Sequence, residues 1–200
     1  PVSAQQEAPE TKVSGEWEYR IADKTIHLTG YTGFSQEVEV PATLEQFPVS
    51  VIGDGLFRDH TEIKRVVLPD SVVTIGLSAF SGCTSLEDLR LPAELVRIQN
   101  EAFRYCSALQ QLELPVKLTT IGAAAFEGCS TVKSLRIPNS VTTIGANAFQ
   151  YCNALSSVTF SKNLRTLGEN AFAFTPWLAA QTDEFVLVGN KILLKYNGTD

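Results

Sequence analysis

The sequence lacks the signatures by which most enzymes are recognised. It contains only two histidines, and it has neither a glycine-rich phosphate loop nor a zinc-ligand spacing. It also lacks an excess of positive charge, because 16 basic residues stand against 22 acidic ones and leave a net charge of −6. No apolar run approaches the length of a membrane-spanning helix. We therefore expect no catalytic centre, no cofactor or metal, no nucleic-acid partner and no membrane insertion.

Methionine is absent as well, and the chain begins at Pro1. We interpret the chain as a processed or trimmed product from which any targeting segment has been removed. The rest of the composition is that of an ordinary globular protein. With 44% hydrophobic and 19% charged residues, the chain can bury a sizeable core.

The sequence does contain a repeat of 23 residues. The stretch SVTTIGANAFQYCNAL at 140–155 recurs as KLTTIGAAAFEGCSTV at 117–132, ELVRIQNEAFRYCSAL at 94–109 and SVVTIGLSAFSGCTSL at 71–86. A short fixed period indicates stacked units, because one unit cannot bury its apolar face alone. One position holds phenylalanine in six successive copies, namely Phe57, Phe80, Phe103, Phe126, Phe149 and Phe172.

Each part of the repeat predicts a local structure. The L-x-L segment alternates and should form a short strand with both leucines facing inward. The proline that follows ends the strand, because proline cannot donate to a β-ladder. We expect V-x-x-I-G to be extended with its glycine in a tight turn, and A-F to form one short helical turn. The fold class is therefore an α/β repeat solenoid, a right-handed superhelix of 23-residue coils with a parallel β lane, short helical turns and a phenylalanine spine.

The two ends of the chain differ from the repeats. Residues 1–15 are rich in proline, glutamine and glutamate, which predicts a disordered linker. A single domain of residues 16–200 follows, with a hairpin cap at 16–33, repeats at 34–175 and a second cap at 176–200. The second cap contains FVLVGNKILLKY at 185–196, a hairpin pattern. An insertion around Thr43 to Phe47 should form a loop. A stack needs such caps to shield its end faces from water.

The four cysteines, Cys83, Cys106, Cys129 and Cys152, share one position of the repeat. Stacked coils about 4.8 Å apart bring their Cα atoms within disulfide range. Equivalent side chains point the same way, however, so their Cβ atoms also stay about 4.8 Å apart, beyond the roughly 3.8 Å that a disulfide prefers. We prefer a ladder of free, buried thiols over disulfides. A metal site is disfavoured because a line of ligands does not converge on a tetrahedral point.

The repeat resembles the BspA-like leucine-rich repeats of bacterial surface or secreted proteins. The resemblance rests on I-G-x-x-A-F-x-x-C and L-x-L-P in register over four full copies, and it covers roughly Gly15 to Gly198. The Y-T-G entry at Tyr31 and the T-P-W…F-V-L-V-G-N…Y-N-G exit also resemble that family. The resemblance implies a secreted or cell-surface protein with no shared catalytic residues. Some members bind host proteins or other bacteria.

The outward positions of the L-x-L strands are the first candidate binding surface. Two hypotheses compete for them. They could form a concave binding face, as in many solenoids, or a self-paired surface in which Arg65 stacks on Asp88 and the charges of Arg90, Glu113 and Arg136 alternate. We prefer the self-paired surface, since no aromatic anchor lies among these positions. The candidate residues of the lane are Arg65, Asp88, Arg90, Gln111, Glu113 and Arg136.

Two tyrosines and one histidine complete the candidates. Tyr105 and Tyr151 occupy the second position after the phenylalanine in alternate coils, where Gly82 and Gly128 stand in the others. Exposed tyrosines can anchor a partner, but edge packing is the commoner role. His60 occupies the slot that cysteine fills in later coils, and we expect it to be structural.

Three functions follow as hypotheses, in decreasing order of preference. The first is a non-catalytic, extracellular or cell-surface protein-interaction module, such as an adhesin, that acts as a monomer on an unknown host or bacterial protein. The second is a structural spacer that displays another domain of a longer surface protein. The third is an enzyme, which would need a closed pocket with a perturbed titratable group.

Overall fold

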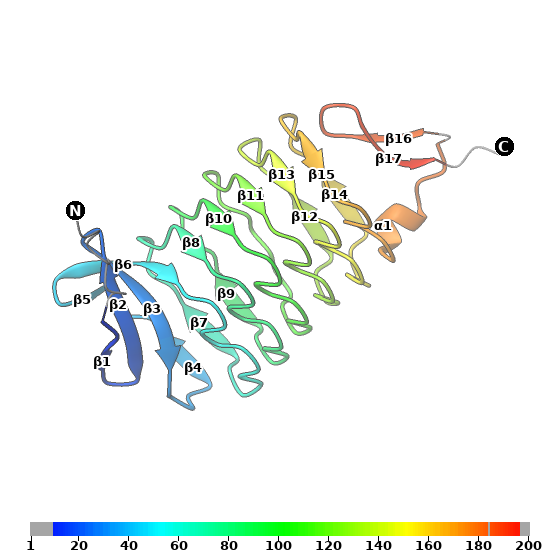
Figure 1. The fold of residues 1–200 in the computed structure, drawn as a ribbon. Helices are drawn as coiled ribbons and strands as arrows, with labels where there is room; N and C mark the ends of the chain where they lie inside the picture. The colour runs from blue at the N-terminus through cyan, green and yellow to red at the C-terminus, as the bar shows by residue number, and fades with distance from the viewer. Residues whose placement is uncertain (1–9, 184, 197–200) are drawn as a thin grey trace, which may run out of the picture.

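The computed structural model describes residues 10–183 and 185–196. These residues form a stack of coils with one hairpin at each end (Figure 1). The predicted linker over residues 1–9 lies outside the described part. At residues 12–14 the linker prediction is wrong, because β1 (Lys12–Ser14) pairs with β2 (Trp17–Ala22).

The N-terminal cap is the predicted hairpin, extended by its neighbours. β2 pairs with β3 (Thr25–Tyr31) across Asp23 and Lys24, both of which have positive φ, as a type I′ turn requires. The insertion is a second hairpin rather than a loop. β5 (Thr43–Leu44) pairs with β6 (Phe47–Ile52) across Glu45 and Gln46, which also have positive φ.

The V-x-x-I-G segments form a continuous parallel ladder, which we call the isoleucine lane. Its members pair in perfect repeat register, for example Ile98 with Ile121. The ladder joins β6 and through it the N-terminal cap, giving a ten-stranded sheet. The two-residue strands of this lane are β8 (Thr74–Ile75), β10 (Arg97–Ile98), β11 (Thr120–Ile121), β13 (Thr143–Ile144) and β15 (Thr166–Leu167).

The L-x-L segments lie on another side of each coil and form what we call the leucine lane. The lane is not continuous: β4, β7 and β9 make one parallel sheet, and β12 and β14 make another. Residues 111–113, where the sequence predicts a strand, pair with no neighbouring strand in the described structure. The strands of this lane are β4 (Glu37–Glu39), β7 (Arg65–Val67), β9 (Asp88–Arg90), β12 (Ser134–Arg136) and β14 (Ser157–Thr159).

The A-F segments are consecutive tight turns, so the predicted helical turn is wrong. In one coil, Ser81 donates its N–H to the carbonyl of Ser78 and Cys83 donates to Phe80, each three residues back. Ser78 has a φ of 53°, outside the right-handed helical region. Alternate residues of each turn donate to the next coil, as Phe80 does to Ala102 at 2.7 Å. The turns therefore form a third ladder that holds neighbouring coils together.

The glycine of I-G has a different role from the predicted tight turn. A Cβ atom at Gly145 would lie 2.4 Å from the backbone N of Ala123 in the preceding coil, and one at Gly168 would lie 2.1 Å from that of Ala146. Glycine is therefore favoured by the close approach of two coils. Gln99 occupies the same position, and nothing in the structure explains why a side chain is accepted there.

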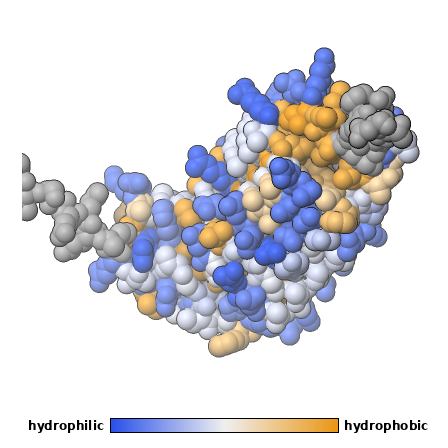
Figure 2. Space-filling view, turned by 45° about the vertical axis from the view of Figure 1, so that its right-hand side comes forward, coloured by the Kyte–Doolittle hydropathy of each residue, from blue (hydrophilic) through white to orange (hydrophobic). Residues whose placement is uncertain are grey.

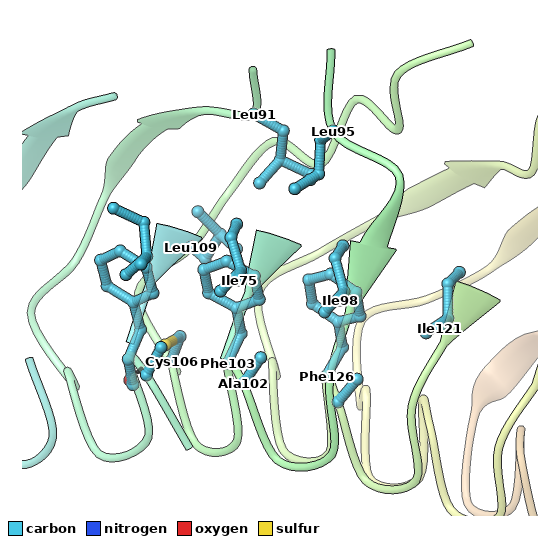
Figure 3. Close-up of a cluster of buried hydrophobic side chains, with 14 of the residues drawn as sticks. Ile75, Leu91, Leu95, Ile98, Ala102, Phe103, Cys106, Leu109, Ile121 and Phe126 are labelled. Carbon is cyan, nitrogen blue, oxygen red and sulfur yellow. Dashed lines mark hydrogen bonds between the residues drawn. The ribbon is translucent and has the colours of Figure 1, made fainter. Parts of the chain in front are cut away.

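The core is the predicted phenylalanine spine. All six rings are at most 1% exposed, and successive ring centroids lie 4.9 to 5.3 Å apart. Figure 3 shows Phe103 and Phe126 projecting into the interior beside Ile75, Ile98 and Ile121. Offset stacks of this kind add to the stabilisation that burial alone supplies.

Aromatic side chains cover both ends of the spine. Tyr31 and Trp17 lie 5.3 and 6.1 Å from Phe57. At the other end, Trp177 lies 5.5 Å from Phe172. Trp177 belongs to α1 (Pro176–Ala179), a short helix that Thr175 caps by accepting a hydrogen bond from Leu178. The predicted C-terminal hairpin follows as β16 (Phe185–Val188) and β17 (Ile192–Tyr196).

The four cysteines are free and fully buried, which confirms the thiol ladder. Each Sγ donates to the carbonyl of a phenylalanine in the preceding coil, at 2.9 Å for Cys83 and 3.2 Å for Cys129. Burial raises the pKa of the Cys83 and Cys152 thiols to about 12 and that of Cys129 well above its ordinary value. These thiols stay protonated near neutral pH and therefore do not act as nucleophiles.

Candidate functional site

The leucine lane presents the candidate polar side chains to solvent, as its alternation predicts. In β7 and β12 the central residue is buried and both flanking residues are exposed. The inward side chains supply the core packing of each coil. The identity of the outward side chains is not constrained by that packing and can differ between coils.

The predicted self-pairing of these charges is found at one place in the lane. Arg65 Nε lies 3.3 Å from Asp88 Oδ2, and both side chains are more than half exposed, so this pair contributes little to stability. Within the described residues, no ion pair joins Arg90, Glu113 and Arg136. The expected alternating charge ladder is therefore wrong.

The charge ladder fails because the lane opens at residues 110–116, which we call the open segment. Within the described chain, no backbone hydrogen bond joins the open segment to the coil before or after it. Leu109 and Leu118 are fully buried on either side. Lys117 also forms an ion pair with Glu94 of the preceding coil. The open segment therefore curves away from the neighbouring coils only locally, between the buried residues Leu109 and Leu118.

The other two ladders continue past the opening. Phe103 donates its N–H to Ala125 at 2.8 Å, and Phe126 donates to Ala148 at 2.8 Å. β10 pairs with β11, and β11 with β13, in regular register. Neighbouring coils therefore stay together on two sides and separate only along the leucine lane.

The separation leaves a groove of about 670 Å³ between β9 and the open segment. Its lining includes four of the sequence-predicted residues, Asp88, Arg90, Gln111 and Glu113. A second hollow of about 390 Å³ adjoins it over β7 and includes Arg65. The structure thus brings five of the six lane candidates to two neighbouring hollows, and Arg136 lines neither.

Leu89 and Leu114, which also line the groove, were not among the predicted site residues. Both are only partly buried, whereas Val66 and Leu135 at the equivalent position to Leu89 are 2% and 3% exposed. The sequence offers no signal for this difference, because the consensus leucines are present in the opened coil.

The two predicted tyrosines line neither hollow. Tyr105 is 45% exposed, and the guanidinium of Arg104 lies 4.8 Å from its ring centroid. Tyr151 is 42% exposed and stacks on Phe174 at 4.8 Å. Phe174, 23 residues after Tyr151, continues this edge and was missed by the sequence analysis. Both tyrosines make edge packing contacts.

His60 packs with the N-terminal aromatic residues. Its ring lies 5.6 Å from Tyr31, and its Nδ1 lies 2.7 Å from Glu62 Oε1, which lowers the pKa of that carboxyl. In the described ranges, His, Cys, Asp and Glu form no cluster that could hold a metal ion. No helix described in the structure is both long and apolar enough to cross a membrane.

Comparison with known proteins supports the reading of the repeat. The sequence profile of the family described as "BspA type Leucine rich repeat region" matches residues 38–179 in six copies, which is more than half of the chain. The chain belongs to this family. No curated protein sequence matches it significantly.

Solved structures of leucine-rich-repeat proteins resemble the chain. The leucine-rich repeat protein of T. pallidum is 31% identical with a TM-score of 0.73, over 80% of this chain and 82% of that one. A leucine-rich cell surface protein of Faecalibacterium prausnitzii is 25% identical with a TM-score of 0.72, over 94% of this chain and 58% of that one.

The pneumococcal vaccine antigen PcpA shares the fold at 21% identity, with a TM-score of 0.66. It is matched over 84% of this chain and 48% of its own. The chain thus spans about half to four fifths of the lengths of these three proteins.

Proposed function

We propose that this BspA-type domain is a non-catalytic protein-interaction module that binds its partner on the leucine lane. We further propose that it works outside the bacterial cell, as an adhesin. The observation that carries the proposal is the opening of the lane, which places partly exposed leucines around a groove together with Arg90 and Glu113, two charges that make no ion pair among the described residues. BspA-type proteins are interaction scaffolds in general, and one similar protein is described as a cell surface protein.

The described surface favours the lane over the rest of the molecule. Figure 2 shows one face on which hydrophilic residues predominate, with apolar residues gathered near the C-terminal hairpin. That hairpin exposes Leu187 and Leu193 by about half, whereas the two described hollows both lie along the leucine lane. The lane combines a hollow, charge and apolar surface in one place, which is the composition of many binding sites.

Site-specific photo-crosslinking tests the use of the lane. A photoreactive phenylalanine analogue replaces Gln111 in the lane or, as the matched control, the exposed Glu169 in another part of the repeat. Each variant is irradiated with surface-protein extracts of bacterial and epithelial cells. We expect protein adducts from position 111 in severalfold excess over position 169.

The identified partner is then purified, and its affinity is measured against a charge-reversed lane. The double substitution Arg90→Glu and Glu113→Arg should weaken binding about tenfold or more, because it inverts the charges that face the partner. Glu169→Lys should leave the affinity unchanged. Equal adducts at both positions, or an unaltered affinity, would contradict the proposal and favour the spacer hypothesis.

A further inference from the structure

We infer that the groove between β9 and the open segment takes up an extended, basic segment of a partner protein, which adds to β9 as a parallel or antiparallel β-strand. The inference rests on the proposed function and specifies the chemistry of its ligand. It is carried by three independent properties of the groove: a free strand edge, an apolar floor and an excess of carboxylates.

The free edge belongs to β9. Asp88 donates its N–H to Lys64 on the β7 side at 3.1 Å. Alternate residues of a strand bond to opposite neighbours, so Leu89 directs its N–H and C=O away from β7 and toward the groove. Within the described chain, these groups have no hydrogen-bond partner. A strand edge of this kind binds extended peptides through their main chain.

Part of the lining of the groove is apolar, and we call that part its floor. Leu89, Leu91 and Leu114 line it, together with Pro115 and Val116. Val116 is 79% exposed and therefore offers apolar surface to a bound chain. A bound strand would direct every second side chain toward this floor and the intervening ones toward solvent and the rim.

The rim is acidic. Glu87, Asp88 and Glu113 contribute three carboxylates to the lining, against the guanidinium of Arg90 in the lining and that of Arg65, which pairs with Asp88 from the adjoining hollow. Glu113 and Glu87 make no ion pair in the described structure, and the whole chain carries a net charge of −6. Charge complementarity therefore selects a segment in which lysine or arginine alternates with apolar residues.

The open segment itself does not supply this strand. It is held at Leu109 and Leu118, and its own backbone lies out of hydrogen-bonding range of β9. Next to the open segment, the isoleucine lane and the turns already form their hydrogen bonds between neighbouring coils. The coils therefore stay stacked without any pairing across the gap. The groove can therefore stay open in the free protein.

Titration with a designed peptide tests the inference. The probe is a capped peptide of about eight residues in which lysine and valine alternate. Binding is measured by calorimetry and by nuclear magnetic resonance of the intact chain. We expect saturable binding, with amide shifts and new exchange protection centred on Leu89 and on residues 110–114.

Two matched probes separate main-chain pairing from charge attraction. The same peptide with alternate backbone amides N-methylated keeps its charge but loses donors, and it should bind at least about tenfold more weakly. A glutamate–valine peptide should not bind the native chain. Equal affinity of the methylated and unmethylated peptides overturns strand addition.

Charge reversal on the protein provides the complementary test. Glu113→Lys should weaken the lysine–valine peptide severalfold at low salt and strengthen the glutamate–valine peptide, whereas Glu169→Lys should change neither. Both positions are exposed, so both variants should keep the thermal stability of the native chain. An affinity that Glu113→Lys does not alter overturns the acidic-rim argument.

The outcomes also distinguish this inference from the proposed function. Lane-specific crosslinks without peptide binding overturn strand addition and leave the interaction module intact. Peptide shifts that map away from the groove overturn the inference as well. If sedimentation shows instead that two copies of this chain associate through the groove, a second copy and not a partner segment is its occupant, and the inference is wrong.

Discussion

Replacing Phe126 with alanine is expected to lower the free energy of unfolding by about 3–5 kcal/mol. Phe126 is 0% exposed and lies between two stacked neighbours, with ring centroids 5.1 Å from Phe103 and 5.3 Å from Phe149. The substitution removes a buried ring and leaves a cavity in the middle of the spine, where neighbouring coils are fixed by hydrogen bonds and cannot collapse. Urea unfolding followed by circular dichroism measures the loss.

The matched control is Phe174→Ala. Phe174 also belongs to the repeat edge and stacks on an aromatic neighbour, but it is 65% exposed. We expect its replacement to cost less than about 1 kcal/mol. Equal losses of stability for the two substitutions would contradict the conclusion that Phe126 belongs to a continuous, tightly packed core along the solenoid.

The second large effect is a steep loss of stability at alkaline pH. Burial raises the pKa of Cys83 and Cys152 from an ordinary value of 9.0 to about 12, and it raises the pKa of Cys106 and Cys129 well above the ordinary value. Above about pH 9 the unfolded chain therefore releases thiol protons that the folded chain retains. Stability is fully present below that pH and falls as the pH rises toward the folded-state values.

Each thiol contributes a slope of up to about 1.4 kcal/mol per pH unit, so four thiols together approach about 5 kcal/mol per pH unit. Urea unfolding at a series of pH values from about 8 to 11 measures the slope. Because tyrosines and lysines titrate in the same range, the control is a variant with all four cysteines replaced by alanine. Its slope should be much shallower, whatever its absolute stability. An unchanged slope would show that the thiols are accessible when the chain is folded.

The repeat determines the fold because its buried positions are chemically uniform. Phe126, Ile121 and Cys129 recur at fixed spacing, and a stack of similar coils buries all of them in one continuous core. The local geometry of the turns was harder to predict. A-F is compatible with a helical turn, and the choice of consecutive turns with a left-handed residue depends on hydrogen bonds to the next coil.

The candidate site could also be predicted only in part, because its geometry depends on contacts between neighbouring coils. Alternation along L-x-L places Arg90 and Glu113 on the outer face, and the structure confirms those positions. Whether their strands pair depends on the spacing between two coils, which the consensus does not encode. Leu112 and Leu135 are equivalent in sequence, yet β12 contains one of them and the open segment contains the other.

Hydrogen exchange of backbone amides in the free protein tests the opening of the lane most directly. Val66, Leu89, Leu112 and Leu135 occupy one position in four successive coils. Val66 and Leu135 lie in paired strands and direct their N–H groups toward the next coil. Leu89 directs its N–H into the gap, and Leu112 lies in the open segment, which makes no backbone hydrogen bond to a neighbouring coil within the described chain. We expect the amides of Leu89 and Leu112 to exchange at least about 100-fold faster than those of Val66 and Leu135. Similar protection at all four amides would show that the leucine lane is a closed, continuous sheet and would contradict a binding groove at this site.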